Sequence, residues 1–330
     1  MFRSPIRHGA AIAAAAVIVL ACAGSAVAQT KWAHLRVVAH TGRTLAEFRQ
    51  YTGATTVRSS TKADCFGSPS RDKRYRMADP NALGLIKDGL ASDRSLRPLV
   101  LSDAFVDDGF GLGICSMGGF ETVGFSYWDL VVDHVVASTG AQLTPVHNGD
   151  RILWYFTSGG EPASGPRELV LRAPASARPG DPFTARVLRF TGQGRSSPAG
   201  GVAVMAGDRR VATTGPDGEA RVRLAHSAAL EATGTANDIP SNHVAVCVNA
   251  SASRCPDAHG ELMYGSRHAD RIKGTRGWDR IKARGGADVV NLRRGGHDRV
   301  SCGGGRDRVI LERGDRDDDV APSCERVIRR

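Results

Sequence analysis

The apolar positions of this chain follow three different patterns along its length, and the first covers residues 30–160. Short β-branched and aromatic runs at 35–39, 55–58 and 152–156 are typical of strands. One segment is helical instead: after Asp79-Pro80, apolar residues at 83, 85, 86 and 90 share one face. They predict a helix that is capped by Asp79, has its proline at the first helical position and ends near Ser92. We expect a small α+β sheet with the helix on one face.

A turn signal precedes the last strand of this segment. Asn148-Gly149 is a preferred type I′ hairpin dipeptide, so a hairpin is expected there, with the final strand beginning at Asp150.

The second pattern covers residues 166–249, after a proline- and glycine-bearing linker at 162–166. Short alternating strands recur there at even spacing, separated by turns such as Pro179-Gly180-Asp181. They are expected at 169–171, 183–187, 202–204, 220–224, 230–232 and 244–248. This spacing predicts an immunoglobulin-like β-sandwich.

The third pattern is a repeat of nine or ten residues within 256–330. Aspartates recur with a β-branched residue two positions later and, in four of five cases, a glycine two positions earlier; His268 is the exception. The aspartates are Asp270, Asp279, Asp288, Asp298 and Asp307, and the apolar partners are Ile272, Ile281, Val290, Val300 and Val309. So short a period predicts a parallel β-roll or solenoid in which each repeat forms one turn.

The repeat resembles the haemolysin-type (RTX) nonapeptide, in which aspartates and turn carbonyls hold calcium between successive turns. The resemblance implies that the five aspartates are calcium ligands. It also implies turns at Gly274, Gly277, Gly285, Gly286, Gly295, Gly296, Gly304 and Gly305. Four of the aspartates are followed directly by arginine, however, and several repeats lack their first glycines. A metal-free solenoid with Asp–Arg pairs is therefore the alternative.

The end of the first segment resembles a bacterial family of unknown function. Ser126-Tyr127-Trp128, Asn148-Gly149-Asp150 and Ile152-Leu153-Trp154-Tyr155 carry the likeness. That family shares a β-grasp fold with the C-terminal domain of transcobalamin, which helps to cover a corrinoid. The resemblance implies a β-grasp domain in residues 30–160. Tyr127, Trp128, Trp154 and Tyr155 then either pack in its core or form a platform for a small molecule or glycan.

The N-terminus predicts export. Arg3 and Arg7, an apolar run and Ala26-Val27-Ala28 form a secretory signal over residues 1–28. A lipoprotein signal ending at Cys22 is the alternative. Cleavage lowers the formal net charge from +10 to +8. The arginines are spread along the chain without interleaved aromatics, which argues against nucleic acid as a partner and leaves cell-wall polymers or surface proteins. No stretch predicts a membrane span.

Six of the seven cysteines would remain in the exported chain. An even count in an oxidising compartment predicts disulfides. They fall as two per expected domain, so we predict Cys65–Cys115, Cys247–Cys255 and Cys302–Cys324. The last pair would tie a cap onto the solenoid.

Together these patterns predict a mainly β, multidomain, exported protein. No motif of a common enzyme class is present. The leading hypothesis is a non-enzymatic surface, matrix or adhesion-type protein with a degenerate calcium-binding tail. The alternative is a β-grasp protein that binds a corrinoid-like small molecule or a glycan and has a purely structural tail.

Overall fold

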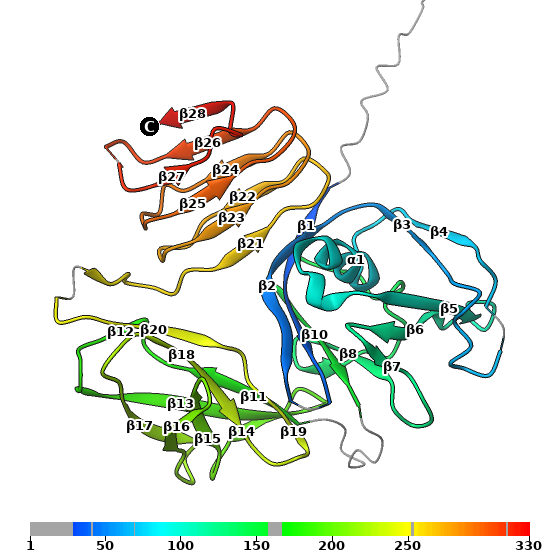
Figure 1. Cartoon of the computed structure of the whole chain (residues 1–330), viewed down its shortest axis with the longest axis horizontal. Coiled ribbons are helices and arrows are strands. Elements are labelled where there is room, and N and C mark those ends of the chain that lie inside the picture. The colour runs from blue at the N-terminus through cyan, green and yellow to red at the C-terminus, as the bar shows by residue number, and fades with distance from the viewer. Residues whose placement is uncertain (1–28, 41, 69, 158–166, 252–253, 315) are drawn as a thin grey trace, which may run out of the picture.

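A computed structural model describes residues 29–40, 42–68, 70–157, 167–251, 254–314 and 316–330. The predicted signal at 1–28, with Cys22, and the linker at 162–166 lie outside the described residues. Within this part of the chain the fold is mainly β, with one α-helix, α1 (Ala82–Ser92), and one 3-10 turn, η1 (Arg94–Leu96) (Figure 1). The predicted fold class, mainly β and multidomain with a parallel-strand tail, is confirmed.

The largest sheet has nine strands and spans two of the three sequence patterns. Its order is β27-β25-β23-β21-β2-β1-β10-β8-β9. The N-terminal part consists of β1 (Lys31–Val38), β2 (Thr44–Thr52), β8 (Trp128–Val132), β9 (Val135–Val136) and β10 (Asp150–Phe156). β1 runs antiparallel to β2 and parallel to β10. Alternate residues such as Leu35 and Val37 point into a core that α1 covers with Leu83 and Ile86.

Helix α1 begins two residues later than the sequence predicts. Its N-cap is Asn81, whose Oδ1 accepts a hydrogen bond from the Gly84 backbone N–H at 2.8 Å. Asp79 is therefore not the cap, and Pro80 lies outside the helix. Asparagine is as good a cap as aspartate, so composition did not separate the two positions. The predicted end at Ser92 is confirmed.

The predicted hairpin at Asn148-Gly149 is wrong, although β10 does begin at Asp150. The neighbour of β10 on that side is β8, which is reached through a long loop. Asn148 instead joins this loop to β1, because its side chain accepts a hydrogen bond from the Trp32 backbone N–H at 3.1 Å. Gly149 has φ of +97°, so the turn chemistry is present without a paired preceding strand.

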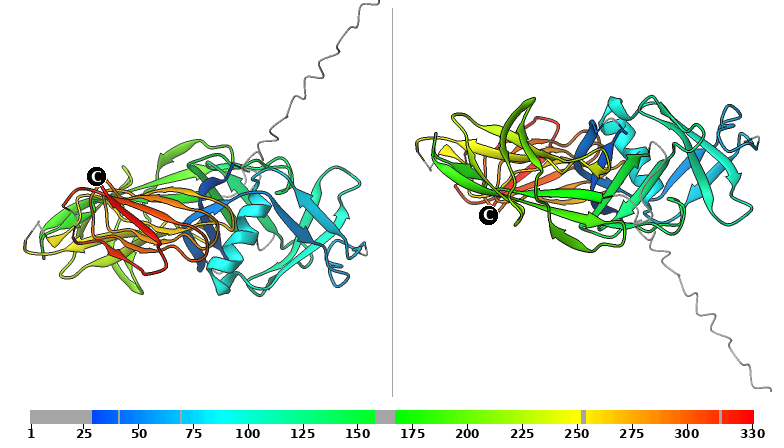
Figure 2. Two further views of the ribbon diagram at one scale, coloured as in Figure 1. Left: turned by 90° about the horizontal axis from the view of Figure 1, so that it is seen from above. Right: turned by 90° about the horizontal axis from the view of Figure 1, so that it is seen from below.

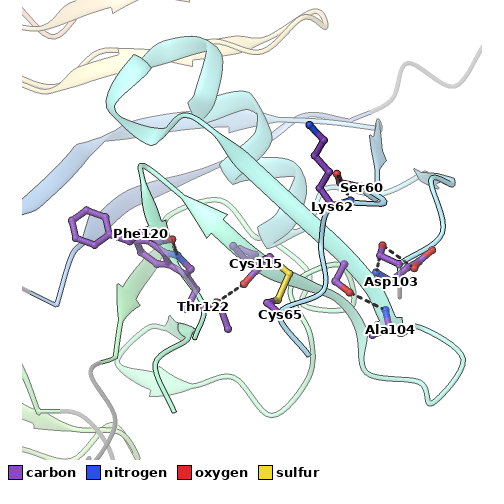
Figure 3. Close-up of a disulfide and its surroundings, with 12 residues drawn as sticks. Ser60, Lys62, Cys65, Asp103, Ala104, Cys115, Phe120 and Thr122 are labelled. Atoms are coloured by element: carbon purple, nitrogen blue, oxygen red, sulfur yellow. Dashed lines mark hydrogen bonds between the residues drawn. A yellow bond between two sulfur atoms is a disulfide. The ribbon is translucent and has the colours of Figure 1, made fainter. Parts of the chain in front are cut away.

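The remaining strands of the first segment cover the helix side of the large sheet. β3 (Thr55–Arg58) pairs with β4 (Arg74–Met77). A three-stranded sheet contains β5 (Leu99–Phe105), β6 (Gly111–Met117) and β7 (Phe120–Glu121). Figure 3 shows the predicted Cys65–Cys115 disulfide, which ties the loop after β3 to β6. The structure also contains the other two predicted disulfides.

Residues 167–248 form two five-stranded sheets around one apolar core. One sheet contains β11 (Arg167–Arg172), β13 (Pro182–Thr191), β14 (Ser196–Pro198), β17 (Glu219–Arg223) and β19 (Asp238–Ile239). The other contains β12 (Ser176–Ala177), β15 (Ala203–Ala206), β16 (Arg209–Thr213), β18 (Ala228–Thr233) and β20 (Val244–Val248). Period-2 residues such as Val187, Val204 and Val222 fill the space between the sheets.

The tail is a solenoid whose strands alternate between two parallel ladders. One ladder, β21 (Leu262–Tyr264), β23 (Arg280–Lys282), β25 (Arg299–Ser301) and β27 (Asp319–Val320), belongs to the nine-stranded sheet. The other contains β22 (Arg271–Lys273), β24 (Val289–Asn291), β26 (Arg308–Leu311) and β28 (Arg326–Arg329). Two repeats therefore make one coil, which corrects the prediction of one repeat per turn. The five predicted apolar residues are buried between the ladders.

The solenoid continues the sheet of the first segment. β21 pairs in parallel with β2, with Arg49 opposite Met263 (Figure 1). His268, the residue that replaces glycine in the first repeat, donates a hydrogen bond from its ring Nε2 to the Ala54 carbonyl, 2.8 Å away. The first coil has β2 on one side and the second coil on the other, and on the β2 side His268 lies against Gly53 and Ala54 in place of a preceding coil.

The sandwich also contacts the first segment through charged groups. Arg36 pairs with Glu168 at 2.5 Å, and His134 contacts the other oxygen of Glu168 at 2.6 Å. The His134 ring stacks on Phe190 with centroids 3.8 Å apart. The two views of Figure 2 show the sandwich and the solenoid next to one another beside the first segment.

Candidate functional sites

An aromatic pocket lies between the nine-stranded sheet and the sheet that contains β5 and β6. Its volume is about 360 Å³. The walls are formed by side chains of β8 and β10, by the β5–β6 connection and by residues 137–141. Three of the four aromatic residues predicted from the sequence line it: Tyr127, Trp128 and Trp154.

The two tryptophans differ in how their indole N–H groups are satisfied. Trp128 donates to the Phe120 carbonyl at 3.2 Å. Trp154 is 3% exposed, and its Nε1 has no hydrogen-bond partner among the described residues. A buried donor without a partner costs about 1–3 kcal/mol and is uncommon in native proteins.

Tyr155 lies on the opposite face of the sheet, away from the pocket. It belongs to a small cluster with Val38 and Val131, and its hydroxyl donates to Asp129 at 2.9 Å. Burial raises the pKa of Asp129, and the bond from Tyr155 opposes this shift. Consecutive residues of a strand point to opposite faces of the sheet, which is why Tyr155 and Trp154 lie on different sides.

The wall opposite the tryptophans contains residues that the sequence analysis missed. Phe66 and Phe105 contact each other with tilted rings whose centroids are 4.9 Å apart, and both line the pocket. Phe66 directly follows the cystine residue Cys65, so the disulfide holds this ring against β6. A side chain at Gly113 would collide with the Phe66 ring. The Cys–Phe adjacency was the one signal in the sequence, but nothing local showed which strand the ring would face.

The mouth of the pocket is lined by exposed aromatic side chains. Phe110 is 64%, Tyr127 44% and Phe105 37% exposed. Phe125, in the turn just before Tyr127, is 87% exposed. Large apolar residues gathered at one opening are typical of interaction or ligand sites.

The second candidate site is the row of aspartates in the solenoid. All five are at most 1% exposed. Each accepts hydrogen bonds from backbone N–H groups, and neighbouring coils are linked because one aspartate N–H donates to the next carboxylate in its column. Examples are Asp270 to Asp288, Asp279 to Asp298 and Asp288 to Asp307, each at 2.8 Å.

The first two aspartates have hydroxyl partners, which Asp288 and Asp307 lack among the described residues. Four residues before Asp270 and Asp279 stand Ser266 and Thr275, whose N–H and hydroxyl groups donate to both carboxylate oxygens. The equivalent residues before Asp288 and Asp307 are arginine and glycine. The Oδ2 atoms of Asp288 and Asp307 are buried and have no hydrogen-bond partner among the described residues.

Three of these carboxylates have raised pKa values. Burial raises the pKa of Asp270 to about 6, although bonds from Ser266 oppose the shift. Burial, together with the charges of Asp270 and Asp307, raises the pKa of Asp288 to about 7. Burial also raises the pKa of Asp279. Within the described residues, no cluster of three histidine, cysteine or acidic side chains is positioned to hold a metal ion. Any cation here would therefore need backbone carbonyls as well.

The predicted turn glycines allow the coils to approach one another. A side chain at Gly286 or Gly305 would collide with the backbone of the preceding coil, and both have φ above +110°. Gly277 and Gly296 occupy the same position in the other column and are equally close to backbone. Gly274 lies near Asp279, while Gly285, Gly295 and Gly304 are more open. Arg284, at φ of +80°, takes a position that glycine usually fills.

Three of the four arginines that follow the aspartates lie on the outside of the solenoid, and Arg308 is half-buried. Arg271, Arg280 and Arg299 are exposed strand residues, and Arg299 faces Asp319 at 3.7 Å. The predicted Asp–Arg pairs are therefore not what holds these aspartates. The hydrogen bonds described above link the aspartates to backbone N–H groups instead.

No helix in the described part of the chain is long and apolar enough to cross a membrane. Three disulfides are typical of proteins that fold in an oxidising compartment.

Comparison with known proteins gives one partial match. Residues 114–158 match a family described as a domain of unknown function (DUF4430). The matched segment contains β7, β8, β9 and β10, and with them Tyr127, Trp128 and Trp154 of the pocket. No curated protein and no solved structure matches the chain. The likeness therefore covers the pocket side of the first segment and does not extend into the sandwich or the solenoid.

Proposed function

We propose that the chain is an exported, non-enzymatic binding protein whose small-molecule site is the aromatic pocket. The observation that carries the proposal is the aromatic lining of the pocket, to which Tyr127, Trp128 and Trp154 contribute. The match of residues 114–158 to a family with a transcobalamin-like β-grasp fold supports the same site. A volume of about 360 Å³ lies at the small end of ligand pockets, about 300–1,000 Å³, and is too small to enclose a corrinoid.

A thermal-shift screen of the full chain tests the proposal. The panel contains neutral aromatic compounds, mono- and disaccharides, and a corrinoid. A ligand at 100 times its Kd stabilises the folded state by about 2.7 kcal/mol, which raises the melting temperature measurably.

A pocket-filling variant provides the control for this screen. Ser138 is exposed and lines the pocket, so Ser138→Trp should fill the mouth and abolish the shift. Ser197→Trp, on an exposed edge strand of the sandwich, should leave it unchanged. A shift that survives Ser138→Trp would place the ligand elsewhere, and a flat panel would remove support for the pocket.

A second function, calcium binding by the tail, is favoured by the unpartnered Oδ2 atoms of Asp288 and Asp307. Carboxylate oxygens are ligands that calcium prefers. These two residues are stacked in one column, and they would hold the ion together with turn carbonyls. Asp270 and Asp279 are weaker candidates because serine and threonine donors already occupy their oxygens. Bound calcium would supply positive charge between coils, as expected of a surface or matrix protein with an extended tail.

Thermal unfolding in about 5 mM calcium against a chelator tests this second function, since extracellular modules bind with a Kd of about 0.1–1 mM. Calcium should raise the melting temperature of the full chain. The double variant Asp288→Asn and Asp307→Asn should remove the rise, whereas Asp270→Asn should keep it. An equal melting temperature with calcium and chelator would leave the tail as a purely structural element.

A further inference from the structure

The middle of the solenoid buries its acidic side chains and exposes its basic ones. Residues 262–311 contain twelve lysine and arginine residues and five acidic residues, which are the aspartates of the repeat. All five aspartates are at most 1% exposed. Ten of the twelve basic residues are exposed, and the other two, Arg284 and Arg308, are half-buried. The charged groups that this stretch presents to solvent are therefore all positive.

The parallel ladder arranges some of these cations in columns. Arg280 of β23 lies opposite Arg299 of β25, and Lys282 lies opposite Ser301 (Figure 1). Residues in register on neighbouring strands are about 4.8 Å apart and point to the same face of the sheet. Ile281 is buried inside the solenoid, so Arg280 and Lys282 on either side of it share the outer face.

Two exposed rings lie in the turns that lead into these strands. Trp278, two residues before Arg280, is 43% exposed. His297, two residues before Arg299, is also exposed, and its ring lies edge-on to that of Trp278 with the centroids 5.5 Å apart. A pair of rings and a pair of arginines therefore follow the same two coils.

This surface, which we call the cationic face, consists of Trp278, Arg280, Lys282, His297 and Arg299. It ends at β27, where Asp319 lies opposite Arg299. On the other side it ends at β21, where Tyr264 is half-buried opposite Lys282.

The exposure of the cations favours a polymer over a small anion. One ion pair between exposed groups changes an affinity by less than about fivefold. A chain that carries many anionic groups makes several such contacts, and each contact after the first is intramolecular.

The rings limit the kind of polymer. The flat apolar face of an indole can pack against the C–H face of a sugar ring. A site for single-stranded nucleic acid needs aromatic side chains for successive bases, and Trp278 is the only tryptophan, tyrosine or phenylalanine in residues 265–311.

We propose that the cationic face of the solenoid binds a linear anionic polysaccharide. Arg280, Lys282 and Arg299 pair with the anionic groups of the polymer, and the Trp278 ring packs against its sugar rings. This function is additional to that of the aromatic pocket, which lies in the first segment and has its own lining. The solenoid then attaches the exported chain to a surface that carries such a polymer.

Three polymers separate the contribution of charge from that of sugar rings. Carboxymethyl-dextran has both, dextran has the rings without charge, and polyphosphate has charge without rings. Binding of the full chain to each end-biotinylated polymer is measured by biolayer interferometry. A chelator is present, so that calcium cannot bridge the polymer and the protein. Carboxymethyl-dextran should bind, with an affinity that falls about tenfold as salt rises from about 0.05 to 0.5 M, because salt screens exposed charges. Dextran should not bind measurably.

Matched charge variants locate the site. A triple variant of the cationic face should bind carboxymethyl-dextran about tenfold more weakly, because three exposed contacts are lost. Its substitutions are Arg280→Gln, Lys282→Gln and Arg299→Gln. The control removes the same net charge from exposed positions of the sandwich and should change the affinity by less than about twofold. Its substitutions are Arg209→Gln, Arg210→Gln and Arg221→Gln.

A third variant tests the ring. Trp278→Ala should weaken binding of carboxymethyl-dextran about threefold to tenfold and leave binding of polyphosphate unchanged. All the substituted side chains are exposed, so the variants should fold, as circular dichroism checks.

Several results would overturn the proposal. Equal losses in the two triple variants would show that net charge alone attracts the polymer, and an unchanged affinity in Trp278→Ala would show that sugar rings are not recognised. Tighter binding of a single-stranded oligothymidylate than of carboxymethyl-dextran at the same salt concentration would make nucleic acid the ligand. Loss of binding in Ser138→Trp would place the polymer in the aromatic pocket. Absence of binding to carboxymethyl-dextran would refute the proposal directly.

Discussion

Arg49 is expected to be the residue on which attachment of the solenoid depends most. It lies on β2, its side chain is 9% exposed, and its guanidinium pairs with Glu261 of the tail at 2.6 Å. It also donates to the Lys273 carbonyl at 3.0 Å and lies 4.2 Å from the centre of the Trp32 ring. Its substitution removes an ion pair, a backbone contact and a cation–π contact at once.

The expected cost of Arg49→Met is about 3–5 kcal/mol, the range for removing one partner from a buried ion pair. Glu261 is left without its cation, and burial already raises the pKa of Glu261. Glu261→Gln should cost less, because Arg49 keeps Lys273 and Trp32 as partners. The double variant should show a favourable coupling between the two residues.

Denaturant unfolding measures the free energies, and hydrogen exchange locates the change. In Arg49→Met, amides of β2 and β21 should exchange faster than in the unmodified chain. The control is Arg299→Met, which removes a pair whose side chains are 72% and 73% exposed and should have no measurable effect. A loss for Arg49→Met no larger than that of the control would refute the idea that this pair holds the tail to the sheet.

Three further predictions concern the first segment. Burial, with help from Arg49 and Arg151, lowers the pKa of His34 to about 4. The contribution of neutral His34 to the free energy of unfolding should therefore be complete above pH 6.5 and fall by roughly 3 kcal/mol as the pH drops to 4. His34→Gln should flatten that part of a denaturation–pH curve. Asp103 accepts hydrogen bonds from the Arg71 N–H, Tyr75, Ser70 and Ser59, which outweigh its burial and hold its pKa at about 2. Asp103→Asn should lower the free energy of unfolding at pH 7 by about 1–3 kcal/mol, measured by calorimetry. An unchanged free energy of unfolding would refute this role. Replacing Cys65 and Cys115 together by serine should cost about 2–4 kcal/mol and weaken ligand binding in the aromatic pocket through Phe66, whereas replacing Cys302 and Cys324 should leave that binding unchanged.

Local patterns were enough to predict the elements in which period and burial agree. The six strands expected in the sandwich are present because each alternates between the core and solvent, as at Val187 and Val222. The buried positions of the solenoid were predicted for the same reason. Asn81 and Asp79 show the limit of prediction from local patterns. Both are good N-cap residues and they lie two positions apart, so only the hydrogen bond from the Gly84 N–H identifies Asn81 as the cap.

The pocket could be predicted only in part. Strand alternation alone places Trp154 and Tyr155 on opposite faces, so one of the four expected aromatic residues could have been excluded. Phe66 and Phe105 could not have been found, because they reach the pocket through a disulfide and a separate sheet. Whether an indole N–H has a partner depends on a carbonyl in another element, as for Trp128 and Phe120.

The aspartate repeat looks the same in sequence whether its carboxylates bind metal or backbone. The coils differ in the residue that stands four positions before each aspartate. Ser266 and Thr275 donate hydrogen bonds to their aspartates. Arginine and glycine at that position leave one oxygen of Asp288 and one of Asp307 without a donor among the described residues. A hydroxyl at that position forms a short-range bond that sequence can reveal. We therefore expect the repeats nearest β2 to be stable without metal, and we expect any effect of calcium to be confined to the distal coils.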